Sequence, residues 1–306
     1  MRVGIDIGGT TTAAVLLRDD DSAAARVSLP SGHGPTAVLD VAVAAVAELC
    51  AVVGLQAVTA VGVGVPGTVD VELGRLHNAV NLGVAELDLA PRLSQRLGVP
   101  VRLENDVNAA AVGAHHALAR AGTRPDSMAY LNLGTGLACG VVLDGQLWRG
   151  ATGAAGEIGH VPVDPAGPWC TCGQRGCLET LCSGGAIARL WPAPDQPPPA
   201  SLFAAAAAGD PAAMAVRDGV VRGVAAAVRL IALSLDVQVV TLGGGVSNVG
   251  GPLLTGVRAA LTALATTSPF LASLGLPARV VLLDRPGEAG ALGAALLAGR
   301  LDRARA

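Results

Sequence analysis

The sequence predicts an α/β protein built from two lobes. Its 306 residues exceed the length of a usual single domain, about 100 to 200 residues. Strand-like apolar runs alternate with stretches of helical spacing. The pattern at residues 5–10 also returns at 131–137, which indicates an internal duplication. We therefore expect a smaller lobe over 1–120, a larger one over 121–285, and a cleft between them.

The first lobe is predicted to open with an antiparallel meander, because Gly8-Gly9 and Asp19–Asp21 separate three short apolar runs. A helix starting at Asp106 is predicted because Asn105 and Asp106 are residue types that cap helices. The predicted elements are strands at 2–7, 12–18 and 24–28, a helix at 35–53, a strand at 58–65, a helix near 86–97, a strand at 99–104 and a helix at 106–120.

In the second lobe the repeated pattern continues through 141–145. The stretch Trp191–Ala200 contains five prolines, at 192, 194 and 197–199, and is predicted to be a surface loop, because proline removes donors and opposes helix. Further along we expect helices at 201–208 and 211–234, a strand at 237–242, a helix at 252–266, a strand at 279–284 and a last helix from 288.

Composition narrows the possible functions. The chain is 51% hydrophobic but only 2% aromatic, so close packing of Ala, Val and Leu is expected in the core. With 21 basic and 24 acidic residues and a net charge of −3, there is no dense basic run, and we expect no nucleic-acid partner. All basic residues are arginine, which excludes the phosphate-binding lysines of P-loop proteins and protein kinases.

The compartment is also indicated by the sequence. The N-terminus carries Asp6 and no long apolar segment, so it is not a signal peptide. The charge-free stretches Leu49–Val69 and Val237–Val257 are broken by Gly, Pro, Asn or Thr, which favours buried strands joined by turns over membrane spans. We expect a cytoplasmic protein with no membrane partner.

Two glycine turns end apolar strands, one at Gly8, Gly9 and Thr10 and the other at Gly134, Thr135 and Gly136. Such turns expose backbone N–H groups that bind anions without lysine. Either turn alone is more often a plain hairpin, but the duplication favours phosphate binding by both. At Gly134 we expect a positive φ, which a β-branched residue could not readily adopt.

Other residues are weaker indications of a nucleotide or substrate site. Asp6 could hold Mg²⁺ beside the phosphates or merely cap the turn. Gly243, Gly244 and Gly245 end a strand and precede a helix, where a nucleotide could approach the backbone. Asn105 and Asp106 lie at a strand-to-helix junction, a common place for a site in α/β folds, although helix capping would also explain them.

A metal site is indicated by His160 followed by Cys170, Cys172 and Cys177. One imidazole and three thiolates with glycines around them suit a tetrahedral Zn²⁺ in a closed structural site. Inert thiols or a local disulfide are the alternatives, but without a secretory signal the metal is favoured.

The order of these motifs resembles the ROK sugar kinases over nearly the whole chain, and bacterial glucokinases are nearest in pattern. The stretch from Leu133 through Glu179 carries the most specific part of the resemblance. The motifs that match are those at 6–10, 62–67, 104–108, 133–136, 157–160, the cysteine cluster and 243–245.

The resemblance implies an actin-like, ribonuclease-H-like fold in which ATP, with Mg²⁺, and the sugar meet in the cleft, and a C-terminal helix at about 286–306 that packs back on the first lobe. It implies that Asp106 is the catalytic base and that the zinc loop, 160–177, is structural. Sugar ligands would be Gly67, Asn81, Asn105, Asp106, Glu157, His160 and Glu179. Nucleotide contacts would be Asp6, Gly8, Gly9, Thr10, Thr11, Gly134, Thr135, Gly136, Gly243, Gly244 and Gly245.

Three departures leave the substrate open. Thr11 stands where the family often has lysine, Val84 where it often has tryptophan, and Val80 where it often has proline. Glucose is the leading substrate, and N-acetylmannosamine, N-acetylglucosamine, fructose or a cyclitol are alternatives.

A non-catalytic sugar-binding protein and a sugar-responsive repressor are rival classes, but the motifs are intact and Asp6 leaves no room before it for a DNA-binding domain. The resemblance implies a homodimer or a dimer of dimers.

Overall fold

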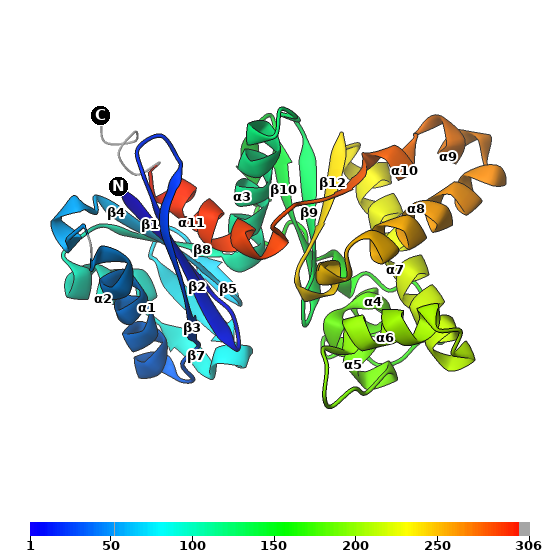
Figure 1. Ribbon diagram of the computed structural model, residues 1–306, viewed down its shortest axis with the longest axis horizontal. Helices are drawn as coiled ribbons and strands as arrows, with labels where there is room; N and C mark the ends of the chain where they lie inside the picture. Colours follow the sequence, from blue (N-terminus) through cyan, green and yellow to red (C-terminus); the bar gives the residue numbers. More distant parts are fainter. Residues whose placement is uncertain (52, 300–306) are drawn as a thin grey trace. The chain divides into compact units, whose positions relative to one another are not determined.

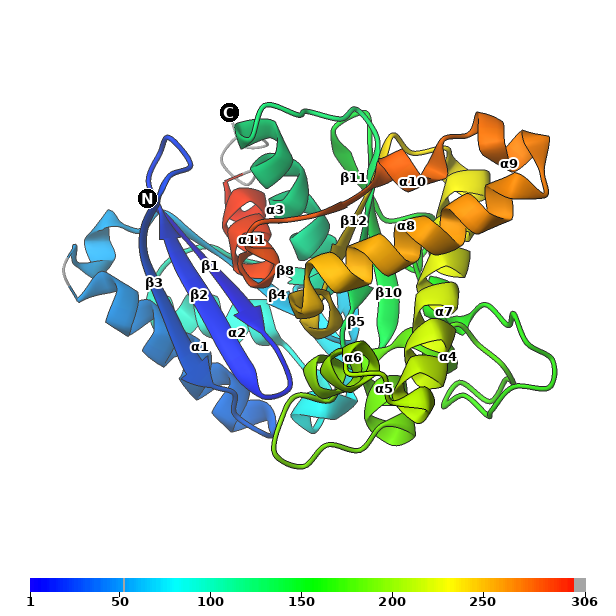
Figure 2. The same ribbon diagram turned by 45° about the vertical axis from the view of Figure 1, so that its right-hand side comes forward.

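The protein is described by a computed structural model for residues 1–51 and 53–299. The chain forms two compact α/β units (Figures 1 and 2). The first unit comprises Met1–Arg124, Arg149–Gly153 and the chain from Glu288, and the second comprises Pro125–Trp148 and Ala154–Gly287. The predicted α/β class with two domains is confirmed.

A five-stranded mixed sheet, in the order β3-β2-β1-β4-β8, forms the centre of the first unit. Strands β1, β2 and β3 are antiparallel, as the predicted meander requires, whereas β4 and β8 run parallel to β1. The bounds are β1 Arg2–Ile7, β2 Thr11–Leu17, β3 Ala23–Pro30, β4 Ala60–Val65 and β8 Val101–Asn105.

The helices of this unit begin where the sequence supplies caps or proline. Asn105 is the N-cap of α3, and its side chain accepts hydrogen bonds from the backbone N–H groups of Val107 and Asn108, so the helix starts at Asp106 as predicted. The bounds are α1 Pro35–Cys50, α2 Leu89–Leu97, α3 Asp106–Arg120 and α11 Ala289–Ala298, with short 3-10 turns η1 Leu55–Ala57, η2 Val80–Leu82 and η5 Pro286–Glu288. Residues 300–306 of the predicted last helix lie outside the described residues.

Small residues let α11 lie directly on strands β1 and β4. Val3 and Ile5 of β1 are buried in the cluster that also contains α1, while Gly4, which alternation points to the opposite face, lies under α11. A Cβ atom at Gly4 would stand 1.9 Å from the carbonyl oxygen of Ala291. The Ala- and Gly-rich composition is therefore what allows this close helix-to-sheet contact.

Helices α3 and α11 approach each other equally closely, which gives a stability prediction. A Cβ at Gly293 would lie 1.7 Å from the carbonyl oxygen of Ala109, so Gly293→Ala should force the helices apart and lower stability by about 1–3 kcal/mol. Gly219→Ala is the matched control, because nothing lies within 4 Å of its Cβ position and the change should be neutral or stabilising by up to about 1 kcal/mol. Chemical denaturation measures both, and equal effects would contradict the prediction.

A small antiparallel sheet, β5-β6-β7, corrects one sequence prediction. The helix predicted near 86–97 begins only at Leu89, because residues up to Leu87 pair with β6 instead. The apolar spacing of Leu87, Ala90, Leu93 and Leu97 fits one helix, but Leu87 is buried as the last residue of a strand. The bounds are β5 Thr68–Asp70, β6 Arg75–Ala79 and β7 Val84–Leu87.

The second unit repeats the sheet order of the first. Its strands lie in the order β11-β10-β9-β12-β13, with β9, β10 and β11 antiparallel and β12 and β13 parallel to β9. The predicted duplication is thus confirmed at the level of topology. The bounds are β9 Met128–Leu133, β10 Leu137–Leu143, β11 Gln146–Trp148, β12 Val239–Gly243 and β13 Val280–Leu282.

One prediction about this unit is partly wrong. The surface loop predicted for Trp191–Ala200 ends at Pro197, because Pro198 and Pro199 form the first turn of helix α6. Proline is tolerated there, since the first N–H groups of a helix have no internal partner. The helices are α4 Glu179–Cys182, α5 Gly184–Leu190, α6 Pro198–Ala207, α7 Pro211–Leu235, α8 Gly251–Thr266, α9 Pro269–Ser273 and α10 Leu276–Arg279, with 3-10 turns η3 Ile158–His160 and η4 Gly245–Val249.

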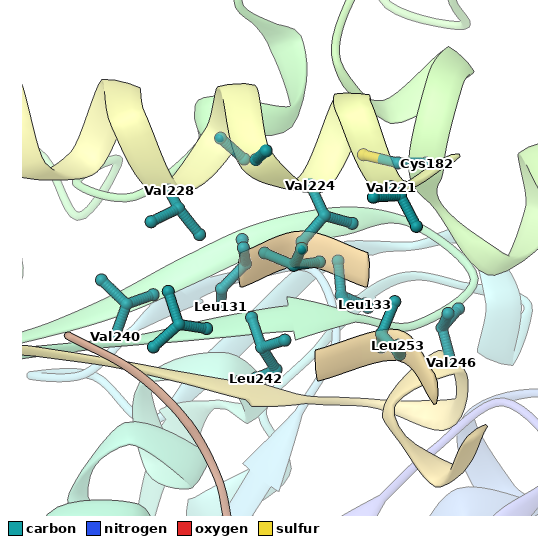
Figure 3. Packing of buried hydrophobic residues seen from close by; sticks show 14 of the residues in the cluster. Leu131, Leu133, Cys182, Val221, Val224, Val228, Val240, Leu242, Val246 and Leu253 are labelled. Carbon is teal, nitrogen blue, oxygen red and sulfur yellow. The ribbon is translucent and has the colours of Figure 1, made fainter. Parts of the chain in front are cut away.

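Aliphatic side chains of α7 pack on the sheet of the second unit (Figure 3). Val224 and Val228 of the helix and Leu131 and Leu242 of the strands are all 1% exposed or less. The core therefore consists of small and medium aliphatic residues, as the scarcity of aromatic residues predicts. Within residues 1–51 and 53–299, the structure contains no helix with the length and apolar character needed to span a membrane.

Candidate active site and metal centre

The first predicted phosphate turn is a tight hairpin between β1 and β2. The N–H of Gly8 donates to the carbonyl oxygen of Thr11 at 2.9 Å, and Gly9, Thr10 and Thr11 are exposed. Ser31 braces the turn from the end of β3, because its hydroxyl donates to the Gly8 carbonyl oxygen at 2.6 Å and its N–H donates to the Thr10 carbonyl oxygen at 3.0 Å. The loop is thus fixed before any anion binds.

Asp6, the last polar residue before this turn, is half-buried in the first unit. Its carboxylate packs against Gly290 in the first turn of α11, where a Cβ would stand 2.1 Å from Asp6 Oδ2. Burial, and secondarily the charge of Asp106, raises the pKa of Asp6 to about 7. A nearby like charge disfavours the ionised carboxylate, so Asp6 holds a proton more readily than a free aspartate does.

The junction of β8 and α3 brings together three of the predicted sugar ligands. Asn105 Oδ1 caps the helix, while its Nδ2 donates to the carbonyl oxygen of Gly67 at 3.4 Å. Asp106 is the first helical residue, and its Oδ1 accepts the N–H of Val107 at 2.9 Å. The capping interpretation therefore holds for Asn105, and the Asp106 carboxylate is not needed for that role.

Asn81 lies beside the predicted phosphate turn of the same unit. It is exposed in η2, and a Cβ at Gly9 would be 3.4 Å from Asn81 Cβ. The first unit therefore places the predicted sugar ligand Asn81 next to a predicted phosphate contact.

The second predicted phosphate turn, between β9 and β10, is held by the start of α5. The N–H of Gly184 donates to the carbonyl oxygen of Gly134 at 2.7 Å, and the N–H of Gly185 donates to that of Thr135 at 3.1 Å. The expected positive φ at Gly134 is wrong: Gly134 is not among the glycines with positive φ. The neighbouring Gly136 matters for its small size instead, since a Cβ there would lie only 2.7 Å from Glu179 Oε2.

The third glycine cluster lies against this second turn. Gly244 has a φ of 75°, and a Cβ there would stand 2.5 Å from the backbone of Leu133. Ser247 holds the loop by donating its hydroxyl to the Gly244 carbonyl oxygen at 2.7 Å. The second unit thus brings the Gly134–Gly136 turn and the Gly243–Gly245 loop together.

Three predicted sugar ligands also gather around β10. Glu179 Oε2 accepts the N–H of Leu137 at 2.9 Å. Gly159, next to His160, packs closely against β10, since a Cβ at this position would lie 1.9 Å from the Leu137 carbonyl oxygen. Glu157 Oε2 is 3.9 Å from His160 Nε2. Glu179 therefore lies against the second predicted phosphate turn, and His160 and Glu157 follow one another along the same end of β10.

The four predicted metal ligands converge. The ligand atoms of His160, Cys170, Cys172 and Cys177 all lie within 4.8 Å of one another. Cys170 Sγ is 3.7 Å from His160 Nδ1, and Cys172 Sγ is 3.7 Å from Cys177 Sγ. Sulfurs around a tetrahedral Zn²⁺ with 2.3 Å bonds are about 3.8 Å apart. The donor set and its spacing therefore fit zinc.

The thiols of this cluster differ in acidity. A hydrogen bond from Gln174 Nε2, at 3.4 Å, lowers the pKa of Cys172 to about 6. Burial, together with the neighbouring thiols, raises the pKa of Cys177 to about 12. Since metals bind thiolates, a cation in this cluster would have to displace a proton from Cys177.

Comparison with known proteins decides the family. The family model described as ROK family matches residues 2–300. The chain belongs to the ROK family. It is 33% identical over 244 residues to a glucokinase of Halalkalibacterium halodurans, covering 72% of this chain and 73% of that one. It is 36% identical over 223 residues to an N-acetylmannosamine kinase of Citrobacter koseri, again covering 72% and 73%.

A solved structure is similar to this ROK protein over nearly its whole length. The ROK family glucokinase of Streptomyces griseus, in complex with glucose and AMPPNP, superimposes with a TM-score of 0.81 at 30% identity, covering 98% of this chain and 99% of that one. The likeness spans both units of the ROK chain.

Two residues with contacts beside the candidate site were not predicted from the sequence of this ROK protein. Ser31 braces the first predicted phosphate turn, but from the sequence a serine after a proline is predicted only to be a loop residue. Arg149 pairs with Glu104, 45 positions away in the sequence, and no spacing rule links them. Only the folded chain brings these partners together.

Proposed function

We propose that this ROK protein is an ATP-dependent sugar kinase that phosphorylates a hexose hydroxyl, with glucose as the first choice. The junction at Asp106 carries the proposal. Asn105 supplies the helix cap, and Asp106 follows it as the first residue of α3, next to the contact between Asn105 and Gly67. These side-chain and backbone groups are suited to sugar hydroxyls. The similarity of the chain to a glucokinase supports glucose as the substrate, and its similarity to an N-acetylmannosamine kinase supports N-acetylmannosamine as the alternative substrate.

In the proposed reaction the first unit supplies the base. Asp106 accepts the proton of the sugar hydroxyl as that oxygen attacks the γ-phosphorus of ATP. A new oxygen–phosphorus bond forms, the bond between the γ-phosphorus and the bridging oxygen breaks, and ADP leaves. Gly67, Asn81 and Asn105 would hold the sugar so that the reacting hydroxyl faces Asp106.

The phosphates would be held by backbone groups of both hairpins. Backbone N–H groups of the turns at Gly8–Thr11 and Gly134–Gly136 would bind phosphate oxygens. The nucleoside would approach the Gly243–Gly245 loop at Gly245, where nothing lies within 4 Å of a Cβ position. Asp6 is the residue suited to Mg²⁺ or its waters, which would supply positive charge at the phosphates. Because the chain contains no lysine, nucleotide affinity would depend on these backbone donors.

Zinc would organise the sugar side of the second unit. We propose that His160 binds the ion through Nδ1, which faces Cys170, and leaves Nε2 for the sugar beside Glu157. Three thiolates and one imidazole leave no open position on a tetrahedral ion, so its role would be structural. The metal would then fix the orientation of the imidazole that contacts the substrate.

The experiment that tests this function is an ADP-release assay over glucose, N-acetylmannosamine, N-acetylglucosamine, fructose and a cyclitol. A sugar kinase releases ADP only when its own substrate is present, and the ratio of kcat/KM values ranks the candidates. Binding of sugar without ADP release from any of them would favour the non-catalytic alternative and overturn the proposal.

A further inference from the structure

A charged side chain is buried directly beside the proposed active site. Glu104, the residue before Asn105, is only 2% exposed. A carboxylate removed from water in this way is stable only when it is paired and hydrogen-bonded. The contacts of Glu104 therefore identify the groups that compensate its buried charge.

Both carboxylate oxygens of Glu104 are engaged. Oε2 accepts the Nε of Arg149 at 3.0 Å and also a second guanidinium donor, Nη2. Oε1 accepts the Nδ2 of Asn108 and the N–H of Asn105, each at 3.2 Å. One carboxylate thus connects the end of β8, the first turn of α3 and the segment Arg149–Gly153.

These contacts hold residues on both sides of Asp106 in the sequence. Asn105 and Asn108, both tied to Glu104 Oε1, lie on either side of it in the sequence, and Asn108 is itself only 6% exposed. A guanidinium with two donors on one carboxylate holds that carboxylate in a fixed orientation. Arg149 therefore acts on the turn that carries Asn105 and Asp106, although it belongs to a distant part of the sequence.

We propose that Arg149 and Glu104 are positioning residues that hold the Asn105–Asp106 turn in its reactive geometry. The inference rests on the proposed kinase function, because it needs Asp106 to act on the sugar. Misplacing a reacting group by about 1 Å costs about 100-fold in rate. The ion pair would therefore control kcat and sugar KM while leaving the KM for ATP unchanged.

A purely stabilising ion pair would behave differently, and a pair of variants separates the two roles. Arg149→Met leaves the Glu104 carboxylate buried and unpaired, so both stability and rate should fall. The double variant E104L/R149M removes that unpaired charge, and apolar replacement of a buried ion pair is often neutral for stability. We expect the double variant to regain its melting temperature but not its rate.

The test measures kcat, both KM values and melting temperature for wild type, Arg149→Met, E104L/R149M and Arg96→Met. Arg96→Met is the control, since it breaks a 2.7 Å ion pair with Asp40 in the same unit, at half-exposed side chains away from this turn. We expect kcat to fall by about tenfold or more in Arg149→Met and in the double variant, with the KM for ATP within twofold. Arg96→Met should retain wild-type kinetics.

Amide hydrogen exchange at residues 105–108 gives a readout that needs no activity. Exchange there should become faster in Arg149→Met and in the double variant, and remain unchanged in Arg96→Met. If wild type is active and kcat recovers together with melting temperature in the double variant, the pair is only structural and the inference is wrong. An inactive wild type overturns the proposed function itself, and the exchange rates then distinguish the two failures.

Discussion

Asp106→Asn is expected to lower kcat for sugar phosphorylation by about 10²-fold or more, the contribution of a general base. Asparagine keeps the shape of the side chain and an Oδ1 that can accept the N–H of Val107, as aspartate does at 2.9 Å. It cannot accept the proton of the sugar hydroxyl. Sugar affinity, measured by calorimetry, should therefore change much less than kcat.

Asp210→Asn is the matched control for this substitution. Asp210 is the N-cap of α7 and accepts the N–H groups of Ala212 and Ala213. Asparagine caps a helix as well as aspartate, so the control should retain wild-type kcat and melting temperature. If Asp106→Asn phosphorylates its best sugar within about threefold of the wild-type rate, below any general-base contribution, Asp106 is not the base.

Loss of the metal is expected to have the second largest effect. Cys172→Ala should reduce bound zinc from one ion per chain to almost none, because it removes one of four ligands. The melting temperature should fall by about 4 °C or more, which corresponds to about 1–2 kcal/mol at this size. The KM for sugar should rise in parallel, since the loop that orients His160 loosens.

Cys50→Ala provides the comparison for the metal prediction. Cys50 is buried in the first unit and lies outside the metal cluster, so its substitution should cost some stability but leave zinc content and sugar KM unchanged. Metal analysis by mass spectrometry measures the zinc in both variants. Active wild-type protein without zinc, or a Cys172→Ala variant with unchanged melting temperature and KM, would contradict the structural role.

Elements with strong local signals agree with their predictions. The start of α3 follows from Asn105 alone, because its side chain caps the helix with bonds to residues two and three positions further along. The turn between the first two strands of each meander follows from glycines between apolar runs. The metal ligands Cys170, Cys172 and Cys177 lie within eight residues of each other, so their meeting requires little more than a local loop.

Predictions failed where two local signals competed. The apolar spacing of residues 86–97 predicts one helix, yet Glu86 and Leu87 end strand β7, because β6 offers backbone partners there. The glycine turn predicts a positive φ at Gly134, which the structure does not have. What this turn requires instead is a small residue at Gly136, where Glu179 approaches closely. Pairing and close approach depend on distant residues, which a local pattern does not contain.

The sequence by itself determined the two-lobed α/β class, the repeated glycine turns, the cysteine and histidine cluster and the capped helix at Asp106, because each depends on residues close together along the chain. Tertiary structure alone decided that Arg149 neutralises Glu104, that Ser31 braces Gly8 and that α11 lies on Gly4. These contacts join segments separated by 45, 23 and nearly 290 positions. Their free energy comes from burial and charge pairing that exist only after the chain has folded.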